Sequence, residues 1–184
     1  MIYKFNSRTY EKCLQFALDR QGKSKRLYKQ RGESRLDKVT EDIVVGALGE
    51  IAASKYFKER GYKCSDPDFE VYEEKSKSYD ADLIVEFFDV HVKSQSTSSF
   101  KRYGASYLCQ KSDKLYKRPG IRDVLCFARV DLEAKEVKIV GCVKARSLKE
   151  HGRWGEAKVP KYRHTKVALY LQDFLTLLYQ FPRK

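Results

Sequence analysis

Apolar residues recur at helical spacing near the start of the chain. Segment 7–20 carries them on one side and has Ser7 as a candidate N-cap, which predicts an amphipathic helix. The following segment, 21–39, is polar and basic and contains Gly22 and Gly32 as helix breakers. We expect an exposed connection or a frayed helix there.

The clearest helical pattern covers residues 41–60. Thr40 is its candidate N-cap, acidic residues favour its first turn, and Gly61 is expected to end it. The helix contains the sequence GALGE (residues 46–50), and each of its glycines weakens a helix by about 1 kcal/mol relative to alanine. That cost predicts that another segment approaches the helix backbone closely. Glu50, the last residue of this sequence, adjoins the apolar stripe.

The period changes to two after this helix, which indicates strands. Five strands are predicted, at residues 69–73, 81–87, 90–95, 123–131 and 136–143, with turns at 74–78, 86–89 and 132–135. Segment 102–119 has no clean period and is interpreted as a loop with a short helix, and segment 166–181 as a strand that passes into a C-terminal helix. The element order predicts a single mixed α/β (α+β) domain over residues 1–184, with a central sheet flanked by helices and with residues 1–39 as an N-terminal helix plus a basic arm.

Positive charge is concentrated in three stretches. The net charge is +13, yet residues 23–38, 101–122 and 144–166 together exceed it, so the rest of the chain is net acidic. Tyrosines and Trp154 lie among the basic residues, and cations with exposed rings are typical of a nucleic-acid surface. A solvated basic surface is the alternative, whereas a membrane partner is not expected, because these stretches lack a wide apolar helical face. The candidate DNA contacts are Lys23, Lys25, Arg26, Lys29, Arg31, Lys101, Arg102, Lys117 and Arg118.

The sequence has no apolar run of the roughly 20 residues that span a bilayer, and its first residues do not resemble a signal peptide. Its five cysteines form no CxxC pair, which favours reduced, buried thiols over a structural zinc site. We therefore expect a soluble cytoplasmic protein, or one of the host-cell cytoplasm if a phage encodes it.

Candidate chemistry gathers on the hairpin 81–95. Side chains alternate along a strand, so Asp89, His91, Lys93 and Gln95 share one face. A tight hairpin would bring Asp82, at the head of the preceding strand, beside His91 and Lys93. An acid and an imidazole, with further oxygen ligands, can hold a divalent cation, and a lysine beside the cation can orient an attacking water.

These motifs resemble the PD-(D/E)xK nuclease superfamily. ADLIV (81–85) is similar to the first active strand, VHVKSQ (90–95) to the second, and GALGE to the helix motif that supplies a further glutamate. The resemblance covers about residues 44–95 and is looser afterwards. It implies a restriction-endonuclease-like mixed sheet flanked by helices, with Asp82 and Glu50 as metal ligands, Lys93 as the catalytic lysine and Gln95 as a polar site residue.

His91 stands where this superfamily has its second acid. As a metal ligand it would leave the choice between Mg²⁺ and Mn²⁺ open. Asp89 could partly replace the missing acid, and Asp80 is a rival to Asp82.

The resulting prediction is a metal-dependent endonuclease that hydrolyses DNA phosphodiester bonds, by analogy in a phage, mobile-element or repair setting. One such site cuts one strand, so double-strand cleavage would need a homodimer or a second encounter. Two alternatives stay open. The first is a nucleic-acid-binding protein with the same fold and a degenerate site, and the second is a basic RNA-associated protein unrelated to nucleases.

Overall fold

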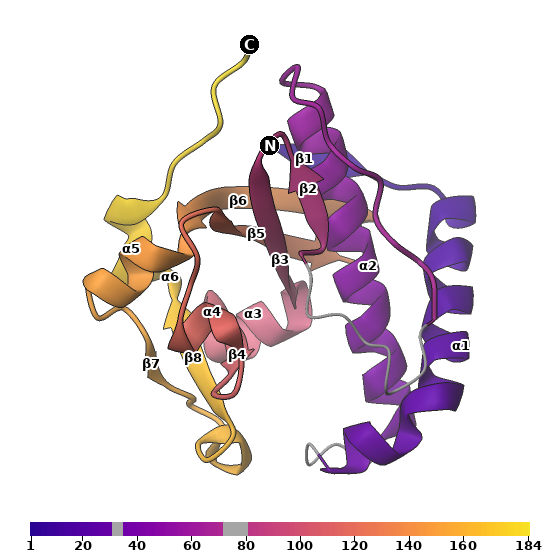
Figure 1. Cartoon of the computed structure of the whole chain (residues 1–184). Helices are drawn as coiled ribbons and strands as arrows, with labels where there is room; N and C mark the ends of the chain where they lie inside the picture. The colour runs from indigo at the N-terminus through magenta and orange to yellow at the C-terminus, as the bar shows by residue number, and fades with distance from the viewer. Residues whose placement is uncertain (31–34, 72–80) are drawn as a thin grey trace.

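The computed structural model describes residues 1–30, 35–71 and 81–184 of the chain (Figure 1). It has a mixed α/β architecture, as the element order predicts. The long helices α1 (Ser7–Gln30) and α2 (Leu36–Lys58) pack against each other, and α2 also packs on the main sheet. No helix in these described ranges combines the length and the apolar character needed to cross a membrane.

The main sheet has five strands in the order β1-β6-β5-β3-β2. Strands β3 and β5 are parallel, with His91 aligned to Leu125, and every other neighbouring pair is antiparallel. The strand bounds are β1 (Ile2–Lys4), β2 (Leu83–Val85), β3 (Phe88–Ser96), β5 (Asp123–Asp131) and β6 (Glu136–Lys144).

A smaller antiparallel sheet has the order β4-β8-β7 and lies beside the main sheet with the short helices (Figure 1). Its strands are β4 (Ser106–Gln110), β7 (Gly155–Glu156) and β8 (Lys166–Tyr170). The short helices are α3 (Thr97–Tyr103), α4 (Lys114–Lys117), α5 (Ala145–Glu150), η1 (Pro160–Tyr162), α6 (Leu171–Phe174) and η2 (Leu175–Leu177).

Two hydrophobic cores lie on opposite faces of the main sheet. Val90 and Val92 of β3 belong to the core shared with α1 and α2. Leu125 and Phe127 of β5 belong to the second core, which includes residues of the small sheet. Strand β5 is therefore buried on both faces, which accounts for its nearly continuous apolar sequence.

The expected close approach to the GALGE backbone is present at Gly49. A Cβ on Gly49 would lie 1.9 Å from Ser94 Oγ, so α2 contacts β3 here through bare backbone. A Cβ on Gly46 would meet nothing within 4 Å. Only the second glycine is thus required by packing.

The start of α2 differs from the prediction. The helix begins at Leu36, after Arg35, so Thr40 is not its N-cap. The Thr40 hydroxyl instead donates to the Leu36 carbonyl at 3.0 Å and accepts from Gln21 Nε2 at 2.8 Å. Helix α1 likewise continues to Gln30, ten residues past its predicted end. Within this additional part, the Gln21 side chain contacts α2. Packing between the two helices extends both into the polar segment that was expected to be a connection.

The predicted strands 123–131 and 136–143 are confirmed, and the hairpin is present with shorter first and longer second strands. Residues 69–71 do not form a strand, while the rest of segment 69–73 and the turn 74–78 extend into residues outside the described ranges. Strands β1 and β4 were not predicted.

The C-terminal segment is helical only from Leu171 to Leu177. Beyond it, Tyr179 exchanges backbone hydrogen bonds with Cys142 at 2.9 and 3.0 Å, and Phe181 is buried in the first core. These contacts with β6 and the core end the helix earlier than the predicted residue 181. All five cysteines are free, and four of them are buried.

Candidate active site

Asp82 lies directly before β2 at the edge of the main sheet. Its Oδ2 accepts a hydrogen bond from the Val92 amide of β3 at 2.7 Å. Because Lys93 is the next residue of β3, this bond fixes the Asp82 carboxylate beside the lysine backbone. The local cause is the short β2, which pairs with β3 only from Leu83 onward and leaves the preceding carboxylate to satisfy the Val92 amide.

Glu50 approaches the same place from α2. It follows Gly49, whose contact with Ser94 brings the helix against β3 one residue after Lys93. Burial, followed by the nearby Asp82 carboxylate, raises the pKa of Glu50 to about 8. The positive charges of Arg20 and Lys93 oppose this rise, and Asp68 adds to it. Glu50, Asp82 and Lys93 therefore share one electrostatic environment.

Lys93 is half-buried, and its positive charge influences the pKa of two residues on different elements. It opposes the rise in the Glu50 pKa, and it also opposes the burial that raises the pKa of Cys109 on β4 to about 12. The lysine thus lies where α2, the main sheet and the small sheet meet.

His91 has a different partner from the one expected. It is 5% exposed, and its Nε2 lies 3.4 Å from Asp123 Oδ1 at the start of β5. Asp123 is 4% exposed, and its Oδ2 accepts from the Gly120 amide at 2.7 Å. The structure groups His91 with Asp123, whereas the hairpin pattern suggested Asp82. Asp123 was not predicted as a partner of His91, because nothing in the sequence indicates that β5 lies parallel to β3.

Gln95 is 6% exposed and its side chain is engaged by the loop before β4. Its Nε2 donates to the Gly104 carbonyl at 2.9 Å and to Ser106 Oγ at 3.3 Å, and its Oε1 accepts from the Ser106 amide at 3.2 Å. These bonds connect the main sheet to the small one. They give Gln95 a structural position next to the candidate site.

The rival acids lie elsewhere. Asp89 Oδ1 accepts from Arg122 Nη2 at 3.2 Å, at the opposite end of β3 from Gln95. Asp80 falls outside the described residues.

The predicted DNA contacts are only partly described. Lys101 and Arg102 on α3, and Lys117 and Arg118 around α4, are exposed. Helix α1 contains Lys23, Lys25, Arg26 and Lys29. Arg31 lies outside the described residues.

The donor set available for a cation is small. Among residues 1–30, 35–71 and 81–184, no group of three or more His, Cys, Asp or Glu side chains is arranged to hold a metal ion. What the structure does bring together is two carboxylates, Glu50 and Asp82, and carboxylate oxygens are the ligands that Mg²⁺ prefers. A bound cation would also offset the repulsion that contributes to the raised pKa of Glu50.

Comparison of the chain with protein-family models, with curated proteins and with solved structures found no significant match.

Proposed function

We propose that this protein is a metal-dependent nuclease that hydrolyses DNA phosphodiester bonds at a site formed by Glu50, Asp82 and Lys93. The observation that carries the proposal is the bond from the Val92 amide to Asp82, which holds one carboxylate beside Lys93 while α2 delivers a second. Two carboxylates and a lysine at the edge of a mixed sheet match the residues that the PD-(D/E)xK resemblance singles out.

Each residue has a distinct role in this proposal. Asp82 and Glu50 would hold the cation, and Asp82 keeps Oδ1 for that purpose because Oδ2 accepts the Val92 amide. When bound, a divalent cation polarises a phosphate and lowers the pKa of a water ligand. The Lys93 ammonium would orient the attacking water or stabilise the charge that develops on the phosphate.

The surrounding charge favours a polyanionic substrate. Carboxylates alone would repel a phosphodiester, but the chain has a net charge of +13 and exposed cations on α3 and around α4. Such cations neutralise phosphates and release counterions, which supplies affinity without reading base sequence.

Plasmid nicking tests the proposal. Supercoiled DNA should be nicked with Mg²⁺ or Mn²⁺ but not with EDTA, and Asp82→Asn or Lys93→Ala should lower the rate at least about 100-fold. Asp89→Asn is the matched control, since it removes an acid of the same hairpin that pairs with Arg122. Nicking by Asp82→Asn at the wild-type rate would exclude this site.

One observation favours a second candidate, a DNA-binding protein with a degenerate site. The residue at the position of the second acid, His91, faces Asp123, which leaves two acidic side chains for a cation. This candidate predicts that wild type binds DNA in a salt-dependent manner and nicks it with neither metal. Nicking that is lost in Asp82→Asn excludes it.

A further inference from the structure

A groove of about 630 Å³ lies along the two long helices. It is bounded by the first turns of α1, the last turns of α2 and the segment 66–69. This segment belongs to the part of the chain that follows α2 and runs beside α1 (Figure 1). The volume of the groove is within the range of roughly 300–1,000 Å³ typical of ligand sites.

The groove is strongly basic. Its lining includes four exposed cations, Arg8 and Lys12 of α1 and Lys55 and Lys58 of α2, and one acid, Asp66, which gives a net charge of +3. Lys58 donates to the carboxylate of Asp66 and lowers its pKa, and the charge of Lys12 lowers it further. Arg8 and Lys55 form no ion pair with any acid that the structure describes. Most of the positive charge of the groove is therefore uncompensated.

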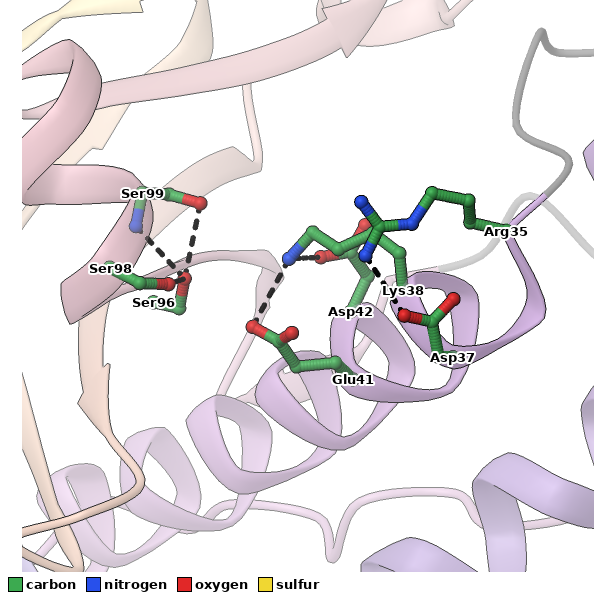
Figure 2. Close-up of polar contacts among 8 residues, drawn as sticks. All are labelled: Arg35, Asp37, Lys38, Glu41, Asp42, Ser96, Ser98 and Ser99. Atoms are coloured by element: carbon green, nitrogen blue, oxygen red, sulfur yellow. Dashed lines mark hydrogen bonds and ion pairs between the residues drawn. The ribbon is translucent and has the colours of Figure 1, made fainter.

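The cations at the start of α2 differ in this respect. They border another pocket, of about 440 Å³, next to the end of β3. Figure 2 shows the Lys38 ammonium between two acids of its own helix, with Glu41 Oε1 at 3.1 Å and Asp42 Oδ1 at 2.9 Å. Arg35 Nη2 lies 2.9 Å from Asp37 Oδ2. These acids compensate the cations around them, so the groove along α1 is the better place for an anion.

The rest of the lining favours a phosphate backbone over an exposed base. The Lys12 ammonium lies 4.8 Å from the centroid of the Phe69 ring, and the Phe16 ring packs edge-on against Phe69 at 5.2 Å between centroids. Both neighbours occupy the ring, whereas stacking of a base needs an open ring face. Ile51 and Pro67 add apolar surface to the groove, which suits the sugar between two phosphates.

The groove lies next to the candidate active site. Ile51, which lines it, directly follows Glu50 on α2. Burial raises the pKa of the Cys13 thiol to about 11, with the Glu50 charge adding to this rise and the Lys12 charge opposing it. Glu50 and Lys12 therefore act on the same thiol of α1. A polyanion held in the groove would thus pass close to the two carboxylates of the site.

We propose that this groove binds the phosphate backbone of duplex DNA on the α1 side of the candidate active site. The inference rests on the proposed function, because it assigns the groove to the substrate of that site. Glu50 and Asp82 would repel a phosphate, and the neighbouring cations offset this repulsion. Arg8 and Lys55 are the main contacts, since no described acid neutralises them.

Binding is measured in EDTA, so that it does not depend on cleavage. The probe is a short fluorescein-labelled duplex, followed by anisotropy over a range of salt concentrations. Arg8→Gln/Lys55→Gln should weaken binding about tenfold and lower the log–log salt slope by about 1.8, since each duplex phosphate contact contributes about 0.9.

Lys4→Gln/Lys138→Gln is the matched control, because it lowers the net charge by the same amount. Tyr3 and Val137 of the same strands belong to the first core, so Lys4 and Lys138 project from the sheet face opposite α1 and α2. This control should leave the slope unchanged. An equal loss in both variants would show that net charge acts instead of the groove, and would overturn the inference.

Lysine acetylation locates the contact in the wild-type protein, without any substitution. Bound duplex should slow the reaction of Lys12, Lys55 and Lys58 with an N-hydroxysuccinimide ester at least about fivefold, because a phosphate covers each ammonium and keeps it protonated. Lys4 and Lys138 should react at an unchanged rate, as measured by mass spectrometry of peptides. At equal charge concentration, poly-glutamate and tripolyphosphate should protect the groove less than the duplex does.

The outcomes separate this inference from the proposed function. Absence of protection would overturn the groove, even in a protein that nicks DNA. Equal protection by poly-glutamate would overturn DNA in favour of an acidic polypeptide, and equal protection by tripolyphosphate would reduce the groove to a site for free anions. A protein that never nicks DNA, yet shows both the protection and the lower slope, would reject hydrolysis and keep the groove.

Discussion

At Gly49 the backbone of α2 contacts the main sheet directly. Ser94 Oγ lies in the space that a side chain would need, and Ser94 Cβ and Ala128 Cβ are only 3.1 and 3.5 Å from the same point. The Ser94 hydroxyl is buried, and it is among the polar atoms without a hydrogen-bond partner in the part of the chain that the structure describes. This one contact sets the distance between α2, which carries Glu50, and β3, which carries Lys93.

Gly49→Ala should therefore destabilise the protein by about 1–3 kcal/mol through overpacking, as measured by urea unfolding. Gly46→Ala is the matched control on the same helix. It meets open space, so its higher helix propensity should stabilise by up to about 1 kcal/mol.

Ser94→Ala provides a second check on this contact. It removes the hydroxyl that clashes, so Gly49→Ala should cost less in that background, and the difference is the coupling energy. Equal costs of Gly49→Ala and Gly46→Ala would show that α2 does not lie this close to β3.

Glu50 gives the stability of the protein a definite pH dependence. Its pKa is raised from 4.5 to about 8 by burial and by Asp82, with Asp68 adding and with Arg20 and Lys93 opposing. As the pH rises, the Glu50 carboxyl therefore loses its proton at a lower pH in the unfolded chain than in the folded protein. Stability from this group is complete below about pH 4.5 and is lost as the pH rises toward 8.

Glu50→Gln is uncharged at every pH and escapes this loss. In EDTA, wild type should lose about 1–3 kcal/mol relative to Glu50→Gln between pH 5 and pH 8.5, measured by urea unfolding at both values. Glu11→Gln, an exposed change on α1, should show no such difference. At pH 8.5, added Mg²⁺ should raise the unfolding free energy of wild type but not that of Glu50→Gln, because a cation favours the ionised carboxylate. A constant difference across pH would mean that Glu50 is not buried beside Asp82.

Among the secondary-structure elements, the connection between the two sheets depends on Gln95. Its amide satisfies the Gly104 carbonyl and the Ser106 amide, which link the end of α3 to the start of β4. Removal of the Gln95 amide takes away the acceptor of the Ser106 N–H and leaves the Gly104 carbonyl with the longer contact of 3.4 Å from Ser106 Oγ.

Gln95→Leu should cost about 1–3 kcal/mol of unfolding free energy. Ser106→Ala removes two long contacts of the hydroxyl, 3.3 Å to Gln95 Nε2 and 3.4 Å to the Gly104 carbonyl, and should cost no more than about 1 kcal/mol. If Gln95→Leu abolishes nicking while its unfolding curve matches wild type, Gln95 acts in catalysis and not in connecting the sheets.

The elements that could be predicted from the sequence are those whose own pattern decides their structure. Strand β5 has a nearly continuous apolar sequence and the body of α2 has apolar residues at helical spacing, and both formed as expected. The start of α2 could not be predicted, because contacts between Gln21 and the first turn of α2 extend the helix through a polar segment. Strand β4 was missed for a similar reason, since its pairing with β8 is a contact between distant segments.

The same division applies to the candidate site. Asp82, Glu50 and Lys93 could be proposed as a group from the sequence, because local motifs and an antiparallel hairpin suggest that they lie near one another, and in the structure Asp82 and Lys93 both influence the pKa of Glu50. The pairing of His91 with Asp123 depends on the parallel alignment of β3 and β5, which lie far apart in the sequence. The pocket of about 440 Å³ that is lined by Ser94 and Gln95 could not be predicted either, because it is assembled from elements spread between residues 35 and 170.

In the whole molecule, the candidate site and the pocket lie where the three layers meet. Helix α2 covers one face of the main sheet, the small sheet lies toward the other, and β3 carries residues that face both (Figure 1). A shift of these layers relative to one another near β3 would therefore change the geometry around Lys93. Any ligand that holds the small sheet against α2 should therefore also make the candidate site more rigid.

The strand order also determines how the protein can fold during its synthesis. Strand β1 leaves the ribosome before the other strands of the main sheet, yet β6, which contains its register partners such as Lys138 for Ile2, is the last strand of that sheet to be synthesised. At about 5–20 residues per second, the interval is roughly 7 to 27 seconds. Phe181, whose ring centroid lies 4.8 Å from that of Phe57, emerges later still. Helices α1 and α2 are therefore synthesised before most of the strands they pack on, and the first core closes only after Phe181 has emerged.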